Sequence, residues 1–159
     1  MSDADAAGPW YEGVTIPVLL RHARNAYGVA MRAALARIDC EDMPRNGMYV
    51  VGGLALGGER PLGQLVKELR VSKQAAGQLV DTLVLRGYLD RATDPDDRRR
   101  LTIALTARGQ AAAAAQTKAR ERVDAELEAR VGPDCVAELR RALGALCEMG
   151  VSEADESGD

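Results

Sequence analysis

Residues 61–91 read PLGQLVKELRVSKQAAGQLVDTLVLRGYLDR, and this stretch decides the fold. Its first part, which Pro61 is expected to open, has the i, i+3, i+4, i+7 apolar spacing of an amphipathic helix, at Leu62, Leu65, Val66 and Leu69. A second apolar stripe follows Ser72, a favoured N-cap residue, and Gly87 suits the end of that helix. Two short helices joined by a tight turn predict a helix-turn-helix.

The next stretch, DPDDRRRLTIALTARG at residues 94–109, predicts the second strand of a β-hairpin. Residues 101–105 alternate apolar and polar side chains, as a half-buried strand does, and residues 88–91 supply the preceding strand. The intervening DPDD segment is rich in turn-forming residues. Its carboxylates, with Asp90, are expected to hold Arg91 or a tip arginine by salt bridges.

The polar side of the second helix predicts contact with double-stranded DNA. In a helix-turn-helix, the first residues of the second helix reach base edges in the major groove. Glutamine can pair with adenine and lysine with guanine, whereas arginines at a hairpin tip fit a phosphate or a narrow minor groove. Gly77 leaves room for close approach of the helix to DNA. The expected DNA-binding residues are Ser72, Lys73, Gln74, Gln78, Arg98, Arg99 and Arg100.

The stretch from Arg60 to Gly109 resembles the MarR family of winged helix-turn-helix transcriptional regulators. That family's wing reads D-x-x-D-x-R, and an alternating strand and L-T-x-x-G follow it; here these are Asp94, Asp97, Arg99, Leu105, Thr106 and Gly109. The resemblance implies that the helix after Ser72 is the recognition helix and that Arg99 enters the minor groove. It also implies a repressor, released by a small, often aromatic or phenolic, effector that binds between the dimer base and the winged lobe.

The outer segments predict long helices, at residues 14–38, 107–131 and 135–149, with a further apolar helix at 47–56. We expect a mainly α fold in the order α-α-α-α-β-β-α-α: a winged helix-turn-helix with N- and C-terminal dimerisation helices. The outer helices carry more apolar surface than so small a winged domain can cover. This predicts a homodimer that binds a pseudo-palindromic site, with its recognition helices about 10 base pairs apart.

The expected domain organisation is a single MarR-like domain with two short flanking segments. Residues 1–13 form a flexible N-terminal segment, and residues 151–159 form an acidic disordered tail, which Gly150 separates from the last helix. Within the domain at 14–150, the DNA-binding lobe spans about residues 44–106. The dimerisation helices are residues 14–38 and 107–149.

Composition limits the alternatives. The chain has 159 residues, a net charge of −3, no Phe and one Trp, so Leu, Val, Ala and Met must build its core. The net charge alone disfavours nucleic acid, but basic residues outnumber acidic ones between residues 60 and 100. The polar, acidic start and the short apolar runs predict a cytoplasmic protein with no membrane segment.

Other residues suggest weaker hypotheses. His22, Tyr27, Met31 and Met48 are candidates to bind an effector, against the simpler reading that they are core or solvent residues. Cys40, Cys135 and Cys147 lack the spacing of a disulfide framework or metal site, although a redox role for Cys40 is an alternative. We expect no cofactor, metal or catalytic residue, because no nucleophile–base pair, ligand cluster or phosphate loop is recognisable. A winged helix used as a protein-interaction module stays open as the rival function.

Overall fold

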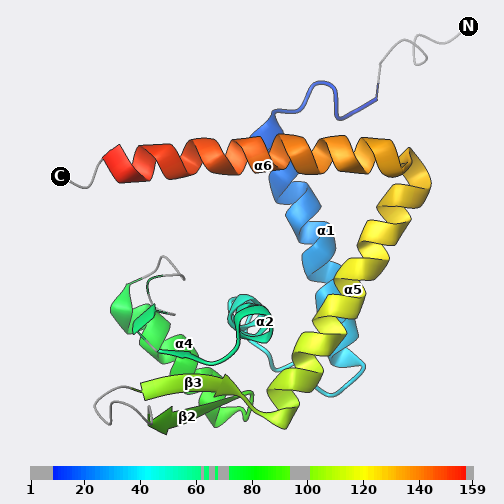
Figure 1. Ribbon diagram of the computed structural model, residues 1–159. Coiled ribbons are helices and arrows are strands. Elements are labelled where there is room, and N and C mark those ends of the chain that lie inside the picture. Colours follow the sequence, from blue (N-terminus) through cyan, green and yellow to red (C-terminus); the bar gives the residue numbers. More distant parts are fainter. Residues whose placement is uncertain (1–8, 62, 65–66, 68–71, 94–100, 157–159) are drawn as a thin grey trace, which may run out of the picture. The chain divides into compact units, whose positions relative to one another are not determined.

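The computed structural model describes residues 9–61, 63–64, 67, 72–93 and 101–156, without the side chains of Arg60 and residues 150–156. The elements are α1 (Ile16–Ala36), α2 (Gly47–Gly57), β1 (Arg60–Pro61), α4 (Lys73–Leu85), β2 (Leu89–Thr93), β3 (Leu101–Leu105), α5 (Ala107–Val131) and α6 (Pro133–Glu156) (Figure 1). The expected class, a mainly helical winged fold, is confirmed. The chain divides into two compact units, residues 1–120 and 121–159, and each is described by itself.

The helices of the first unit begin and end close to where their sequences predict. Pro17 lies in the first turn of α1, where its missing N–H costs no hydrogen bond. Asp39, which follows α1, has a φ of 54°, and Cys40 N donates to Leu35 O at 3.0 Å. Gly58 has a φ of 71° and its N–H caps the end of α2. Asp39 and Gly58 thus end their helices with a left-handed residue.

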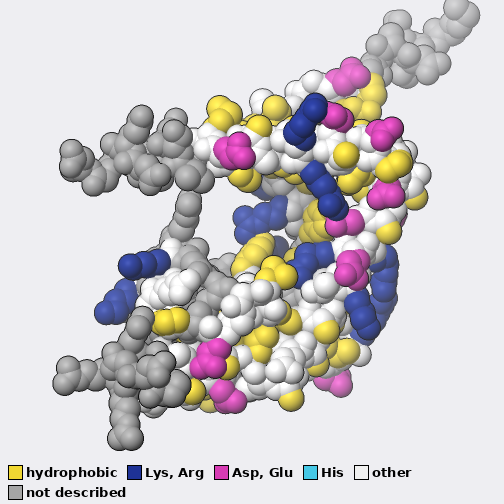
Figure 2. Space-filling model, in the orientation of Figure 1, with side chains coloured by type: hydrophobic (Ala, Val, Ile, Leu, Met, Phe, Trp, Pro, Cys, Tyr) yellow, Lys and Arg dark blue, Asp and Glu magenta, His cyan; other side chains and the backbone are white. Residues whose placement is uncertain are grey.

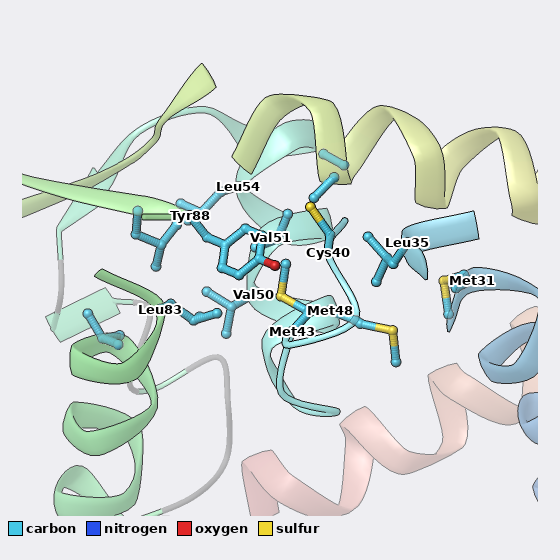
Figure 3. Close-up of a cluster of buried hydrophobic side chains, with 14 of the residues drawn as sticks. Met31, Leu35, Cys40, Met43, Met48, Val50, Val51, Leu54, Leu83 and Tyr88 are labelled. Carbon is cyan, nitrogen blue, oxygen red and sulfur yellow. The ribbon is translucent and has the colours of Figure 1, made fainter. Parts of the chain in front are cut away.

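The core of the first unit is aliphatic and rich in sulfur. Met31, Cys40, Met43 and Met48 pack with leucines and valines from α1, α2 and α4, and Figure 3 shows Cys40 and Met43 near the ring of Tyr88, with Met31 at the far end of the cluster. Tyr88 is fully buried, whereas Trp10, the single tryptophan, is 70% exposed. Methionine compensates for the lack of phenylalanine because its flexible side chain fills irregular gaps.

The three strands form an antiparallel sheet in the order β1-β3-β2. Leu89 pairs with Leu105 in the hairpin, and Arg60 pairs with Ile103 on the other side of β3. The expectation that Pro61 opens a helix is therefore wrong, because Pro61 is in β1. Proline is tolerated there because β1 is an edge strand and one of its sides forms no ladder. The helix expected as far as Leu69 falls largely outside the described residues, although positions 63, 64 and 67 are helical.

The second unit contains the end of α5 and all of α6. Gly132, with a φ of 84°, separates the two helices, and Pro133 occupies the first position of α6. The last helix was expected to stop at Gly150, but α6 continues to Glu156. Residues 151–156 are therefore helical, and the expectation that they are disordered is wrong. A glycine weakens a helix by about 1 kcal/mol but ends it only where the backbone turns left-handed. Gly150 keeps the helical conformation.

One face of α6 carries exposed apolar side chains. Leu139 and Leu146 are each 44% exposed, and Met149 is 68% exposed. Three ion pairs lie on the polar surface of this unit: Arg130–Glu126, Arg141–Glu138, and Arg140–Asp124 at 3.7 Å. In the described part of the chain, no helix combines the length and the apolar character that a bilayer crossing needs.

Candidate nucleic-acid interface

Helix α4 presents the predicted polar residues on one exposed face. Ser72 caps the helix as expected, because its Oγ accepts a hydrogen bond from the Ala75 N–H at 3.2 Å. The opposite face buries Ala76, Val80 and Leu83 completely. The remaining predicted members of the helix are all exposed: Lys73, Gln74 and Gln78. The structure thus brings these four predicted residues together.

Gly77 lies on α4 between Gln74 and Gln78. A Cβ atom built at this position meets no atom of the described chain within 4 Å. Packing inside the chain therefore does not require glycine here. A glycine in a helix also costs stability relative to alanine. The expected close approach of DNA at this residue stays a prediction.

The hairpin is joined to α4 by an ion pair between Arg91 on β2 and Asp81 on α4. Among the described carboxylates, the one that pairs with Arg91 is thus on the helix and is not Asp90, whereas the other carboxylates that the sequence suggested lie outside the described residues. Both partners are partly exposed, so the pair orients the strand more than it stabilises the fold. Residues 94–100, including Arg98, Arg99 and Arg100, lie outside the described residues.

The L-T-x-x-G motif locks the base of the hairpin to the start of α5. The Thr106 hydroxyl donates to Gly87 O at 2.6 Å and accepts from Gly109 N at 3.0 Å, and Thr106 N donates to Tyr88 O at 3.1 Å. A Cβ at Gly109 would lie 2.1 Å from Tyr88 O. A hydroxyl is therefore required at position 106 as a cap and a link, and glycine is required at position 109 because the Tyr88 carbonyl occupies the space of a side chain.

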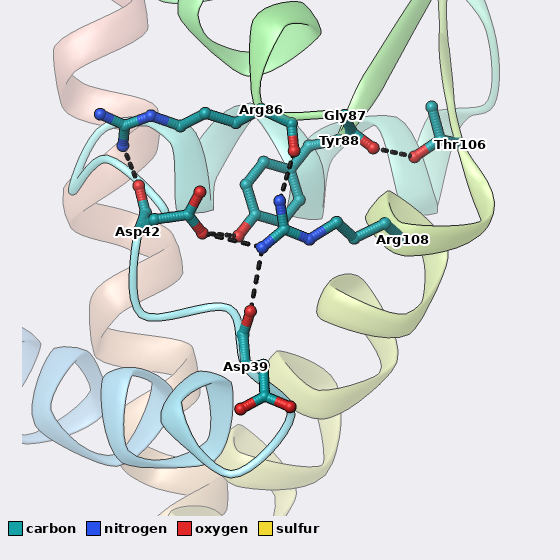
Figure 4. A network of polar contacts seen from close by, with 7 residues as sticks. All are labelled: Asp39, Asp42, Arg86, Gly87, Tyr88, Thr106 and Arg108. Carbon is teal, nitrogen blue, oxygen red and sulfur yellow. Dashed lines mark hydrogen bonds and ion pairs between the residues drawn. The ribbon is translucent and has the colours of Figure 1, made fainter.

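A polar network connects the loop after α1 with the same junction (Figure 4). The Tyr88 hydroxyl donates to Asp42 Oδ1, and Arg108 Nη2 donates to the same oxygen at 3.0 Å. Arg108 Nη2 also donates to Asp39 O at 2.9 Å, and its guanidinium lies 4.3 Å from the centre of the Tyr88 ring. Arg86, which follows α4, donates to the backbone carbonyl of Asp42. The network ties α5 and the end of α4 to the loop between α1 and α2.

The network shifts the pKa values of three of its members. The pKa of Arg108 is raised, because burial lowers it but Tyr88 and Asp42 together outweigh that effect. The hydrogen bond from Tyr88 is the main cause that lowers the pKa of Asp42, and the charge of Arg108 acts in the same direction. Burial raises the pKa of the Tyr88 phenol strongly, and the bond to Asp42 adds to this shift. Sequence reasoning missed Asp42 and Arg108, because no local pattern pairs residues 66 positions apart.

The four predicted effector residues are not gathered in one place. His22 is exposed, Tyr27 is half-buried, and Met31 and Met48 are buried in the core. A pocket of about 360 Å³ lies between α1 and the start of α2; among its lining residues, Met48 alone is one of the four. The site that they were expected to form stays a prediction. The pocket is instead lined by arginines, at positions 21, 24, 32 and 45.

The cysteines do not form a site with one another. Cys40 is buried, whereas Cys135 and Cys147 are exposed on α6, and all three are free thiols. Among the residues that the structure describes, no cluster of three or more His, Cys, Asp or Glu side chains is arranged to hold a metal ion.

Comparisons with known proteins agree with this geometry. The model of the MarR family matches residues 41–100. RV1404 from Mycobacterium tuberculosis is 28% identical, with a TM-score of 0.68 over 91% of this chain and 96% of that chain. The apo form of wild-type MarR from E. coli is 21% identical, with a TM-score of 0.63 over 84% of this chain and 96% of that chain. No curated protein sequence matches significantly.

A third solved structure, the transcriptional regulator Tm0710 from Thermotoga maritima, is 24% identical, with a TM-score of 0.58 over 90% of this chain and 97% of that chain. The similarity to these structures extends over most of the chain, and the family match includes α2, α4 and β2. Residues 41–100 therefore match the model of the MarR family, and the chain has the fold of the solved transcriptional regulators that it resembles.

Proposed function

We propose that this protein is a sequence-specific DNA-binding repressor that acts as a homodimer on a pseudo-palindromic site. The observation that carries the proposal is the exposed face of α4, where Lys73, Gln74 and Gln78 follow a capped N-terminus. The positive end of the helix dipole lies at this same N-terminus, which favours an approaching phosphate backbone.

The reading mechanism follows from how α4 and the hairpin are joined. Two copies of α4, related by a twofold axis, would enter successive major grooves about 10 base pairs apart. The wing arginines Arg98, Arg99 and Arg100 would contact phosphates or the minor groove beside each copy. A dimer bound in this way would repress by competing with polymerase for the promoter.

The dimer is supported by apolar surface on both terminal regions. Leu139, Leu146 and Met149 are exposed on α6, and Ile16 and Val29 are 66% and 52% exposed on α1. A second copy of the chain is the proposed partner of these faces, with residues 14–38 and 107–149 as dimerisation helices and 44–106 as the DNA-binding lobe. We also propose a cytoplasmic location, release of DNA by a small-molecule effector, and no catalytic activity.

The test is a DNA motif selected by the purified full chain, followed by affinity measurements on it. We expect a palindrome. Gln74→Ala and Gln78→Ala should relax the base preference, because glutamine reads base edges. Arg99→Ala should weaken binding to all sequences and reduce the salt slope by about 1, because one phosphate contact is lost.

Lys118→Ala, at an exposed position on α5, is the control and should bind as the parent does. Equal affinity of the parent and all three interface variants for the selected site would refute the proposal. An affinity independent of salt would favour the rival function, a winged helix used to bind another protein.

A further inference from the structure

One face of α1 carries a row of arginines that points into the pocket beside α2. Arg21, Arg24, Gly28 and Arg32 follow each other at helical spacing and line this pocket, and Arg45 contributes a fourth guanidinium from the loop before α2. Figure 2 shows basic side chains over the region of α1. The pocket, of about 360 Å³, has the size of a small-molecule site.

None of the described residues that line the pocket is acidic. Among the described residues, none of the four arginines forms an ion pair. The first turns of α1 and α2 hold no acidic residue either, and the positive end of α2 borders the pocket at Asn46. Arg21 and Arg24 lie one turn apart and repel each other.

One of the arginines, Arg24, is held in a defined position. Arg24 Nε donates to the Tyr49 hydroxyl at 2.8 Å, and its guanidinium lies 4.8 Å from the centre of the Tyr49 ring. This arrangement leaves both terminal nitrogens of Arg24 to bind a ligand. Arg32 Nη1 lies 3.4 Å from the position that a Cβ would take at Gly28, so its guanidinium lies over the glycine at ordinary contact distance. Fixed guanidinium groups suit bidentate recognition of carboxylate or phosphate oxygens.

We infer that this pocket binds a small anion with two or more negative charges, carried by carboxylate or phosphate groups. The four guanidiniums and the end of α2 supply the positive field, and Tyr49 and the buried Met48 supply a small apolar wall. This ligand class differs from the aromatic or phenolic effector that the family resemblance implies. The inference that an anion binds depends only on the pocket. The further step, that the bound anion changes the affinity for DNA, rests on the proposed function.

The experiment is calorimetric titration of the full chain at constant ionic strength with citrate, with pyrophosphate, and with benzoate as a singly charged aromatic anion. We expect citrate or pyrophosphate to bind more tightly than benzoate, and their order distinguishes carboxylate from phosphate recognition. Arg24→Gln and Arg32→Gln should each weaken that binding at least tenfold. Gly28→Leu, which retains all four arginines, should weaken it by filling the space.

Arg37→Gln is the matched control, because Arg37 is exposed at the end of the same helix and does not line the pocket. Absence of binding by both multivalent anions, tighter binding of benzoate, or equal affinity in Arg24→Gln and Arg37→Gln would overturn the inference. Specific DNA affinity is measured on the same samples. Intact DNA binding without anion binding refutes only the pocket, whereas anion binding by a chain that binds no specific DNA refutes only the proposed function.

Discussion

At the scale of single residues, a substitution at Gly77 should change the stability of the fold and the affinity for DNA in opposite directions. A methyl group at this position meets nothing inside the chain, so Gly77→Ala should raise the free energy of unfolding by about 1 kcal/mol. The same methyl group would stand between Gln74 and Gln78 on the face proposed to enter the groove. We therefore expect the variant to be more stable and to bind the selected DNA site more weakly, as measured by denaturation and by titration.

Gly53→Ala is the control for this prediction. Gly53 is also a helical glycine whose added Cβ would meet no atom within 4 Å, but it lies in α2. It should gain similar stability and keep the DNA affinity of the parent. If Gly77→Ala binds DNA as tightly as Gly53→Ala does, the groove does not approach α4 at this residue.

The shifted pKa values of Asp42 and Tyr88 predict how the free energy of unfolding depends on pH. The pKa of Asp42 is lowered from 3.8 in the folded chain, so its contribution is present above that value and is lost as the pH falls through the folded pKa. The pKa of Tyr88 is raised from 10.0, so its contribution is present below pH 10.0 and declines above it, where the unfolded chain ionises first. Stability should therefore fall at both extremes of pH.

The variant that checks this is Asp42→Asn, measured by urea denaturation across pH. It should be less stable than the parent at neutral pH, and the difference should shrink as the pH falls from 3.8 through the lower folded pKa of Asp42, where the folded parent also loses this charge. Asp90→Asn, on the exposed surface of β2, should follow the parent throughout. A constant difference between parent and Asp42→Asn across this range would contradict the role of the Asp42 charge.

At the scale of elements, the junction of β3 and α5 depends on one hydroxyl and one missing side chain. Thr106→Val removes the cap of α5 and the bond to Gly87 O, and should lower the free energy of unfolding by about 1–2 kcal/mol. Thr106→Ser keeps both bonds and should lose much less. Gly109→Ala should cost more than either, because the Tyr88 carbonyl must move. Denaturation curves of the three variants give the order, and equal loss in the serine and valine variants would contradict it.

Element by element, the sequence predicted what depends on local pattern and missed what depends on distant pairing. Residues 101–105 and 107–131 were located to the residue, because alternation and the Thr106 cap are visible in the sequence. The strand β1 was not predicted, because its two residues are strand only through pairing with β3, about 40 positions away. The end of α6 was misplaced because a glycine looks the same in sequence whether the backbone turns there or continues.

The same distinction applies to the candidate sites. The exposed face of α4 was predicted because all its members lie within seven residues. The arginine row of α1 has a visible spacing, but its meeting with Arg45 and Tyr49 depends on how α1 and α2 pack. The sequence did not identify Asp81 as the partner of Arg91, because several other carboxylates lie closer to Arg91 along the chain.

At the scale of the whole molecule, the proposed homodimer predicts which face of α6 tolerates a charge. Leu146→Glu places a carboxylate on the exposed apolar face and should shift the chain toward monomer, because burying an unpaired charge is costly. Ala137→Glu introduces the same side chain on the opposite side of α6 and should leave the dimer intact. Sedimentation of both variants and the parent at matched concentrations measures the outcome. Identical masses for the two variants would argue against this face as the interface.

The exposure of Trp10 and the burial of Tyr88 have a consequence for optical measurements on this protein. Trp10 is the single tryptophan and is already 70% exposed in the folded chain, so its emission reports the N-terminal segment and changes little when the core opens. The Tyr88 ring, enclosed by the core and stacked against Arg108, changes its surroundings completely on unfolding. An unfolding curve from tyrosine absorbance or from helical circular dichroism therefore records the loss of the core, which tryptophan emission would miss.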